Sequence, residues 1–126
     1  MAKTVVFSSA APAPIGPYSQ AIQAGNMLFV SGQIAIQQST GSMITANIEE
    51  EAHQVMKNIE EVLRAAQFNF THVVKTTIFL SDMNNFPKVN AVYGSYFTAE
   101  PPARETVQVS RLPKDVNVEI SCIAVK

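Results

Sequence analysis

Residues 47–67 read NIEEEAHQVMKNIEEVLRAAQ, and this segment predicts a helix from about Ile48 to Gln67. Asn47 is a favourable N-cap residue, and Glu50 follows it at the spacing of a capping box. The acidic side chains of the first turn suit the positive end of the helix dipole. Apolar residues recur at steps of three and four and form one stripe, made of Ile48, Ala52, Val55, Met56, Ile59, Val62, Leu63 and Ala66. A helix with one such stripe is suited to cover a face of a sheet.

Three strands are expected before this helix. The β-branched segment Lys3–Phe7 predicts the first, and residues 8–17, which hold three of the seven prolines, predict a loop. Tyr18–Ala24 and Met27–Gln37 predict the next two strands, because Gly25-Asn26 between them favours a two-residue hairpin turn. Regular alternation along the third strand would place on one face Leu28, Val30, Gly32, Ile34 and Ile36.

The segments after the helix complete a mixed sheet. Val73–Leu80 predicts a strand, and Asn85–Phe97 predicts a second helix that Pro101-Pro102 ends. The last two runs, Ala103–Val109 and Val116–Val125, bracket a turn and predict a hairpin. The element order is then βββαβαββ, and the strand–helix–strand unit around the first helix is expected to be right-handed and parallel. The predicted fold class is α+β, with about six strands and both helices packed on one face of the sheet.

Composition excludes several classes of protein. The length of 126 residues predicts one domain over residues 1–126. The net charge is −1 and the basic residues are scattered singly, so we expect no nucleic-acid partner. One Cys and two His cannot supply the nitrogen and sulfur ligands of a zinc site, so we expect no metal. No apolar run is long enough for a signal peptide or a membrane span, and a single Cys suits a reducing compartment. A soluble cytoplasmic protein without a membrane partner is therefore expected.

The predicted final hairpin places Arg104 and Glu119 on one polar face. For the valines of the two strands to share a face, opposed residues need position numbers with an odd sum. A loop centred between Arg111 and Leu112 puts Arg104 opposite Glu119, and a loop centred on Pro113-Lys114 shifts the pairing but keeps both on that face. Such a pair is suited to be an anion clamp with an acid–base partner. The alternative, which spacing alone favours, is a cross-strand ion pair on a solvated face.

The other titratable residues offer less chemistry. His53 lies beside the helical stripe and His72 lies before a strand, and both are expected at the surface because no nucleophile or acid lies at a meaningful spacing. Cys122 has the parity of Val118 and Ile120, so we expect a buried, inert thiol.

A series of short motifs spans nearly the whole chain. The motifs are Ile15-Gly16-Pro17-Tyr18-Ser19-Gln20-Ala21, Val30-Ser31-Gly32-Gln33, Phe79-Leu80-Ser81-Asp82-Met83, Asn90-Ala91-Val92-Tyr93, Pro102-Ala103-Arg104, and Arg111-Leu112-Pro113-Lys114-Asp115 with Val118-Glu119-Ile120. Together, in this order, they resemble the reactive intermediate deaminase family (Rid, also called YjgF). The resemblance implies a chorismate-mutase-like fold and a homotrimer with three ligand sites in the clefts between subunits.

The activity that the resemblance implies is that of a 2-iminobutanoate/2-iminopropanoate deaminase. Such an enzyme hydrolyses 2-aminoacrylate and 2-aminocrotonate, as 2-imino acids, to 2-keto acids and ammonia. The family's carboxylate-binding Arg falls on Arg104, and its acidic residue near the water falls on Glu119. Its other ligand-contacting positions fall on Tyr18, Ser31, Gly32, Asn90 and Thr106. Many members have Cys where this chain has Thr106 and Gly where it has Gln67, so a thiol at the first position cannot be required here.

Chemistry of this kind needs no cofactor, because an imine is already electrophilic. The guanidinium of Arg104 can bind the substrate carboxylate through two parallel hydrogen bonds. Glu119 can orient a water for attack and later pass a proton to the departing amine. The leading alternative is a regulatory protein that binds 2-keto acids or related carboxylates without turnover, which would need Arg104 but not Glu119. A ribonuclease or translation inhibitor, which the charge argues against, and a chaperone-like role for an apolar surface are further alternatives.

Overall fold

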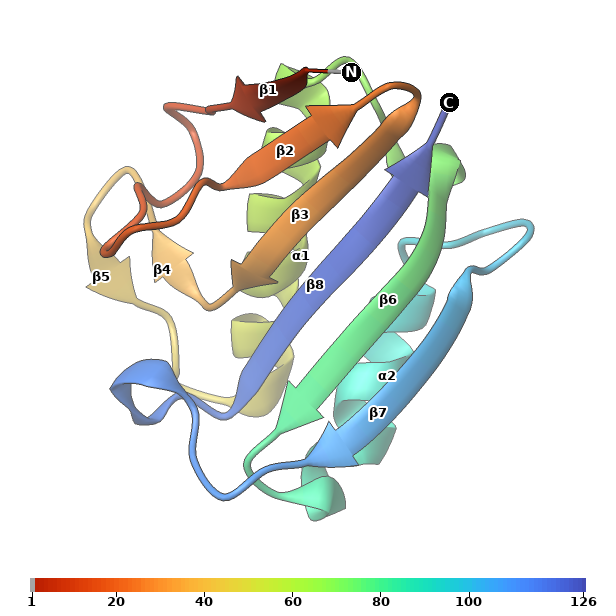
Figure 1. Ribbon diagram of the computed structural model, residues 1–126. Helices are drawn as coiled ribbons and strands as arrows, with labels where there is room; N and C mark the ends of the chain where they lie inside the picture. The colour runs from red at the N-terminus through yellow and green to blue at the C-terminus, as the bar shows by residue number, and fades with distance from the viewer. Residues whose placement is uncertain (1) are drawn as a thin grey trace.

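A six-stranded mixed sheet with two α-helices on one face makes up most of the chain in the computed structural model, which describes residues 2–126 (Figure 1). The sheet has the order β1-β2-β3-β8-β6-β7, and a separate ribbon pairs β4 with β5. The strands are β1 (Lys3–Val6), β2 (Ala21–Ala24), β3 (Met27–Gln33), β4 (Ile36–Gln37), β5 (Ser42–Met43), β6 (Val73–Leu80), β7 (Ala103–Gln108) and β8 (Val118–Val125). Helix α1 (Ile48–Ala65) precedes β6, and α2 (Phe86–Gly94) lies between β6 and β7 in the chain. The predicted α+β class is confirmed.

The predicted hairpin of the last two strands is wrong, because β8 lies in the middle of the sheet and β7 at its edge. β8 pairs antiparallel with both β3 and β6, whereas β7 pairs with β6 in parallel. The physical reason is burial. Every second residue of β8 is buried on the side of the helices, namely Val118, Ile120, Cys122 and Ala124. The main-chain groups of so buried a strand need hydrogen-bond partners on both of its edges. Most of β7 is exposed, which suits an edge strand.

The first predicted helix is confirmed and the second is shorter than predicted. α1 begins after Asn47, whose Oδ1 accepts the Glu50 N–H at 2.8 Å. α2 ends at Gly94, so Pro101-Pro102 do not end it. Residues 95–97 donate their N–H groups to carbonyls three positions earlier, which tightens the chain past the glycine. Within residues 2–126, neither helix combines the length and the apolar character needed to cross a membrane.

A bulge interrupts the third predicted strand. The pairing of β3 with β8 shifts between Val30 and Gln33. Within the shift, Ser31 and Gly32 together stand opposite Ser121, which is the arrangement of a β-bulge. The extra residue reverses the alternation, so Gln33 is buried, and the chain then turns into the β4–β5 ribbon, which the sequence pattern did not predict.

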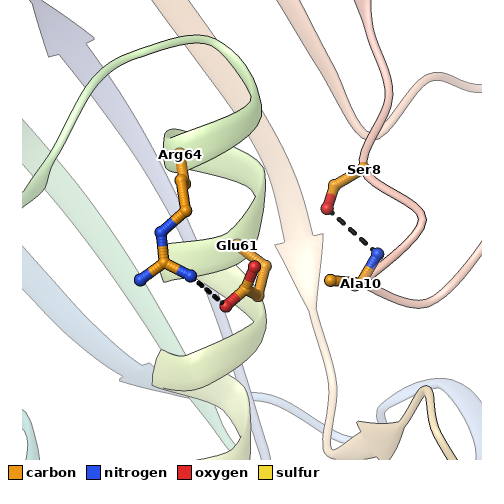
Figure 2. Close-up of polar contacts among 4 residues, drawn as sticks. All are labelled: Ser8, Ala10, Glu61 and Arg64. Atoms are coloured by element: carbon orange, nitrogen blue, oxygen red, sulfur yellow. Dashed lines mark hydrogen bonds and ion pairs between the residues drawn. The ribbon is translucent and has the colours of Figure 1, made fainter.

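A buried glutamine holds the proline-rich loop before β2. Gln20 accepts the Ser8 N–H through Oε1 at 2.6 Å and donates through Nε2 to Ser8 O at 3.1 Å. Figure 2 shows the adjoining turn, in which Ser8 Oγ accepts the N–H of Ala10 at 3.2 Å, beside the ion pair of Arg64 and Glu61 on α1. The loop is therefore anchored through main-chain groups of Ser8, which lie outside any strand.

α1 ends in a left-handed turn at Gln67, where φ is 63°. The Phe68 N–H donates to Leu63 O and the Gln67 N–H donates to Arg64 O, both at 2.9 Å, and these two bonds define a Schellman motif. Lys126 Nζ donates to Gln67 O at 2.7 Å and covers the same turn. The geometry is the one that glycine adopts without strain, but this chain has a glutamine there.

Replacing Gln67 with glycine should therefore stabilise the protein. We expect Gln67→Gly to raise the free energy of unfolding, measured in urea, by about 0.5–1 kcal/mol, because the Cβ strain of the left-handed turn disappears. Ala65→Gly, at an exposed helical position, is the matched control and should lower it by about 0.5–1 kcal/mol. A loss of stability in Gln67→Gly would show that the glutamine side chain contributes more than the strain costs.

Candidate functional site

A hollow on the open face of the sheet, opposite the helices, brings together four of the predicted site residues. Its volume is about 380 Å³, and it is lined by Ile15, Tyr18, Ser31, Gly32, Ile34, Pro113 and Glu119. Tyr18 comes from the loop before β2, the Ser31-Gly32 pair from the bulge of β3, and Glu119 from β8. Three distant parts of the sequence thus surround one carboxylate.

The position of this carboxylate requires a glycine at residue 32. A Cβ atom on Gly32 would lie 2.8 Å from Glu119 Cδ, well inside van der Waals contact. The bulge brings the main chain of β3 over the carboxylate, so only glycine leaves room for it. The colliding atoms belong to the end of a flexible side chain, so a larger residue at position 32 would displace the carboxylate before it displaced the strand.

Ser31 positions the loop that carries Tyr18. Its Oγ donates to Ser19 O at 2.6 Å, and its N–H donates to Gln20 O at 2.9 Å. The serine hydroxyl is thus engaged with the protein, whereas the Tyr18 side chain is 50% exposed at the hollow. Tyr18 is the more accessible of the two to a bound molecule.

Burial raises the pKa of Glu119. The side chain is half-buried in the hollow, and the lining residues include no Lys, Arg or His that would favour the charged form. A carboxylate whose pKa is raised accepts a proton from a water molecule more readily than an ordinary carboxylate does.

A strained turn forms one wall of this hollow through Pro113. Lys114 and Asp115 have φ of 55° and 56°, a left-handed conformation that is uncommon outside glycine. Arg111 spans the turn, donating through Nε to Asp115 Oδ1 at 2.6 Å and through Nη2 to Oδ2 at 3.2 Å. These two hydrogen bonds span the turn on its solvent-exposed side.

A second hollow, of about 450 Å³ at the outer edge of the sheet, contains Arg104 and Asn90. Arg104 Nη1 donates to Asn90 Oδ1 at 2.7 Å. The guanidinium carbon lies 5.0 Å from the ring centroid of Tyr93 and 5.3 Å from that of Phe86. The Tyr93 hydroxyl is in turn hydrogen-bonded to Thr76 Oγ1 at 2.7 Å. Two aromatic rings and one hydrogen bond fix the guanidinium and leave its other N–H groups for an anion.

Thr106 lies near Arg104 on the same edge strand. Val109 donates its N–H to Leu80 O on β6 at 2.9 Å. By alternation along β7, the N–H groups of Arg104 and Thr106 point away from β6, at the outer edge of the sheet. The Thr106 Oγ1 is buried and has no hydrogen-bond partner among residues 2–126. What this position can offer a ligand is therefore its main-chain N–H, which does not depend on the side chain.

The structure separates Arg104 from Glu119, contrary to the prediction from the hairpin. Paired residues on neighbouring strands project from the same face of a sheet. Arg104 is aligned with Thr76, which is buried on the side of the helices, whereas Glu119 is aligned with Phe79 on the open face. Within one chain the two side chains form neither an anion clamp nor a cross-strand ion pair, so both interpretations of the hairpin are wrong.

The remaining titratable candidates lie outside both hollows. His53 is exposed, with Nδ1 3.0 Å from the Tyr96 hydroxyl, and His72 Nδ1 accepts the Asn69 N–H at 3.0 Å next to the start of β6. Cys122 is buried on the helix side of β8, as predicted, and burial raises the pKa of its thiol to about 12. Over residues 2–126, no cluster of His, Cys, Asp and Glu is arranged to hold a metal ion.

The sequence does not predict two parts of this arrangement. Phe86 and Tyr93 hold Arg104, and their spacing of about two helical turns is a signal that they share a face of α2. Ile34 and Pro113 line the hollow of Glu119, but they follow a bulge and precede a left-handed turn, where regular alternation no longer predicts a face.

Comparison with known proteins finds similarity along nearly the whole chain. The family model described as Endoribonuclease L-PSP matches residues 8–126. A RutC family protein of Pyrococcus horikoshii is 52% identical over 124 residues, which cover 98% of each chain. The 2-iminobutanoate/2-iminopropanoate deaminase of Mus musculus is 45% identical over 124 residues, which cover 98% of this chain and 92% of the mouse protein.

Two solved structures superpose closely on this chain. A protein of the conserved Rid family from Yersinia pestis is 47% identical, with a TM-score of 0.96 over 99% of this chain and 100% of that one. TdcF of E. coli, solved with bound serine, is 38% identical, with a TM-score of 0.94 over 98% of each chain.

The raised pKa of Glu119 has a consequence for stability. Between the ordinary carboxyl pKa and the raised value, the folded chain binds more protons than the unfolded chain, so stability falls as pH rises through this range. Glu119→Gln removes the free-energy cost of ionising a partly buried carboxyl group. The free energy of unfolding of this variant at pH 7 should therefore exceed that of the wild type. The difference should shrink as pH falls through about 4.3, the ordinary pKa of a glutamate carboxyl, because the carboxyl is then increasingly protonated in both the folded and the unfolded wild-type chain.

Urea denaturation of both proteins between pH 4 and 8 measures this difference. Glu100→Gln, which makes the same change at an exposed position, should leave stability nearly constant across the range. If Glu119→Gln is less stable than the wild type at pH 7, the carboxylate makes a stabilising interaction that outweighs the cost of its burial.

Proposed function

The chain belongs to the Rid/YjgF family, whose family model is described as Endoribonuclease L-PSP, and we propose that it is an imine deaminase. Its proposed substrates are 2-imino acids, chiefly the imino forms of 2-aminoacrylate and 2-aminocrotonate, and its products are 2-keto acids and ammonia. One observation carries the proposal. The pre-positioned guanidinium of Arg104 lies in one hollow and the half-buried carboxylate of Glu119 lies in another. The name of the mouse relative denotes the same reaction.

In this proposal the active unit is a homotrimer, and each site combines two subunits. The hollow of Arg104 on one subunit meets the hollow of Glu119 on its neighbour, because one chain holds these residues on opposite faces of its sheet. The open face also exposes large apolar side chains, with Val5 61%, Phe29 41% and Val107 41% exposed. An apolar face without a helix to cover it is better buried against another subunit than left in water.

Arg104 binds the substrate carboxylate. Its guanidinium is planar, always charged and already held by Asn90, Phe86 and Tyr93, so little conformational freedom is lost on binding. The outward N–H of Thr106 adds a donor beside it. With the carboxylate fixed, the imine carbon, which is bonded directly to the carboxylate carbon, is held close to one position relative to the protein.

Glu119 activates the water. Its carboxylate accepts a hydrogen bond from a water molecule, takes its proton as the oxygen attacks the imine carbon, and returns the proton to the nitrogen. The product of this step is a carbinolamine. The same carboxylate then carries the hydroxyl proton of the carbinolamine to the nitrogen, so that the C–N bond breaks, ammonia leaves and the carbonyl of the 2-keto acid forms. Gly32 leaves room for this carboxylate, Ser31 fixes the adjoining loop, and the Tyr18 ring covers the bound ligand.

A non-catalytic regulatory protein is the second candidate function. The structural neighbour TdcF was solved with serine bound, and serine carries a carboxylate but no imine. A protein that only senses such carboxylates needs Arg104 and has no use for a carboxyl group of raised pKa. A ribonuclease, which the description of the family model names, is less suited to a net charge of −1 and to histidines that lie outside both hollows.

Two substitutions separate binding from chemistry. Arg104→Lys keeps a positive charge but loses the planar fork, so the affinity for a 2-keto acid should fall by about 1–3 kcal/mol. Glu119→Gln keeps size and most hydrogen bonding but cannot take a proton, so 2-keto acid binding should persist while imine hydrolysis falls roughly 10²-fold. Calorimetric binding and a coupled assay of keto-acid formation from enzymatically generated 2-aminoacrylate and 2-aminocrotonate measure both effects. Arg64→Lys, the same exchange on the surface of α1, should change neither.

Wild-type protein that binds the keto acid without accelerating hydrolysis would establish the regulatory function instead. Full turnover in Glu119→Gln would mean that main-chain groups near Thr106 or Gly32 position the water.

Mixing two inactive variants tests whether the site is shared. Arg104→Ala and Glu119→Gln trimers should each be nearly inactive, but after joint unfolding and refolding at equal amounts about one quarter of the interfaces pair a wild-type Arg104 with a wild-type Glu119. Activity should therefore recover to about one quarter of the wild-type value. Sedimentation equilibrium of the same samples should show three chains per particle. A monodisperse monomer, or no recovery from refolded trimers, would contradict a site between subunits.

A further inference from the structure

Glu51 is a buried carboxylate that the proposed mechanism does not use. It lies in the first turn of α1 with 0% of its surface exposed. Its Oε2 accepts the N–H groups of Asn117 at 2.7 Å and Val118 at 3.3 Å, and its Oε1 accepts Asn117 Nδ2 at 2.8 Å. Three donors from the start of β8 thus meet one helix side chain.

The helix dipole does not account for this burial. Glu49 and Glu50 lie exposed in the same first turn and suit the dipole at no desolvation cost. A carboxylate taken out of water is costly unless its oxygens are satisfied, and here they are satisfied by two main-chain amides and one side-chain amide. The buried Glu51 therefore satisfies and fixes the main-chain N–H groups of Asn117 and Val118.

That segment leads directly into Glu119. Asn117 also accepts the Ser81 N–H through its main-chain oxygen at 3.1 Å and the Ser81 hydroxyl through Oδ1 at 3.3 Å. Asn117 therefore joins the first turn of α1, the end of β6 and the start of β8. The amides that Glu51 holds belong to the two residues immediately before Glu119, so they determine the direction in which the Glu119 side chain leaves the strand.

We propose that Glu51 is a positioning residue for Glu119. By holding the main chain of residues 117 and 118 from the helix side, it directs the Glu119 carboxylate into the space that Gly32 leaves open on the other side of the sheet. The two main-chain hydrogen bonds carry this effect, and the side-chain bond to Asn117 adds support. The inference rests on the proposed function of Glu119, but the position of that carboxylate can be measured without turnover.

Two variants of Glu51 test the proposal by kinetics. Glu51→Met keeps the length of the side chain and removes every acceptor, so kcat for imine hydrolysis should fall on the order of tenfold while KM stays within about twofold, because carboxylate binding depends on Arg104. Glu51→Gln keeps an oxygen for the two main-chain amides and should restore kcat to near the wild-type value. Val62→Ala, buried on the same helix about three turns beyond Glu51, is the matched control: it should lower stability and leave kcat unchanged.

The pKa of Glu119, measured through the ¹³C shift of its carboxyl carbon, gives a readout that does not need activity. In Glu51→Met it should return toward the ordinary carboxyl range, because the carboxylate leaves the hollow for solvent. In Glu51→Gln and Val62→Ala it should stay raised.

The outcomes separate the two proposals. Unchanged kcat and an unchanged Glu119 pKa in Glu51→Met would overturn the positioning role, and so would an equal loss in Glu51→Gln, since the main-chain bonds would then not carry the effect. If the wild type hydrolyses no imine, the proposed function fails, and the pKa of Glu119 in the same variants still decides the role of Glu51.

Discussion

The antiparallel insertion of β8 between β3 and β6 is the constraint on which the rest of the structure depends. A strand with both edges paired and one face packed under the helices has no freedom of register, so every side chain on it has an assigned direction. Glu119 can then project only from the open face, where the bulge in β3 places Gly32 beside it. The same insertion leaves β7 at the edge of the sheet, where Arg104 meets α2 and not the carboxylate.

Within one chain the two charged groups lie in separate environments. The guanidinium of Arg104 lies against two aromatic rings, whereas loss of solvent raises the pKa of Glu119. A guanidinium beside Glu119 within one chain would favour the carboxylate form and lower that pKa. Placing them on opposite faces keeps both prepared states in the single chain. In the proposed trimer the two groups face each other across a subunit interface, and a substrate carboxylate bound there takes up the charge of the guanidinium.

Buried polar side chains secure the irregular backbone around the open-face hollow. Glu51 holds the start of β8, Gln20 holds the proline-rich loop, and Asn58 donates to Ile34 O at 3.0 Å and Ile36 O at 2.9 Å where the chain leaves β3. Each stands where the sheet ladder stops and main-chain groups need other partners. Regular strands supply the rigid frame, and these side chains extend that rigidity to the loops that line the hollow.

The sequence by itself determined the local elements. The apolar stripe and Asn47 predicted α1, the β-branched run predicted β6, and Gly25-Asn26 predicted the hairpin of β2 and β3, because each depends on residues close together in the chain. The short motifs also identified the family, and with it the candidate residues of the proposed site. Burial of Cys122 followed from alternation alone.

Only the tertiary structure decided which strands are neighbours. Alternation in β8 specifies the face that is buried, but the main-chain hydrogen bonds at its edges are the same for every residue type and do not name a partner. Whether β8 pairs with β7 or lies between β3 and β6 depends on how the two helices cover the whole sheet. For that reason the sequence could name Arg104 and Glu119 as candidate site residues but assigned them to one face of the sheet, whereas the fold places them on two.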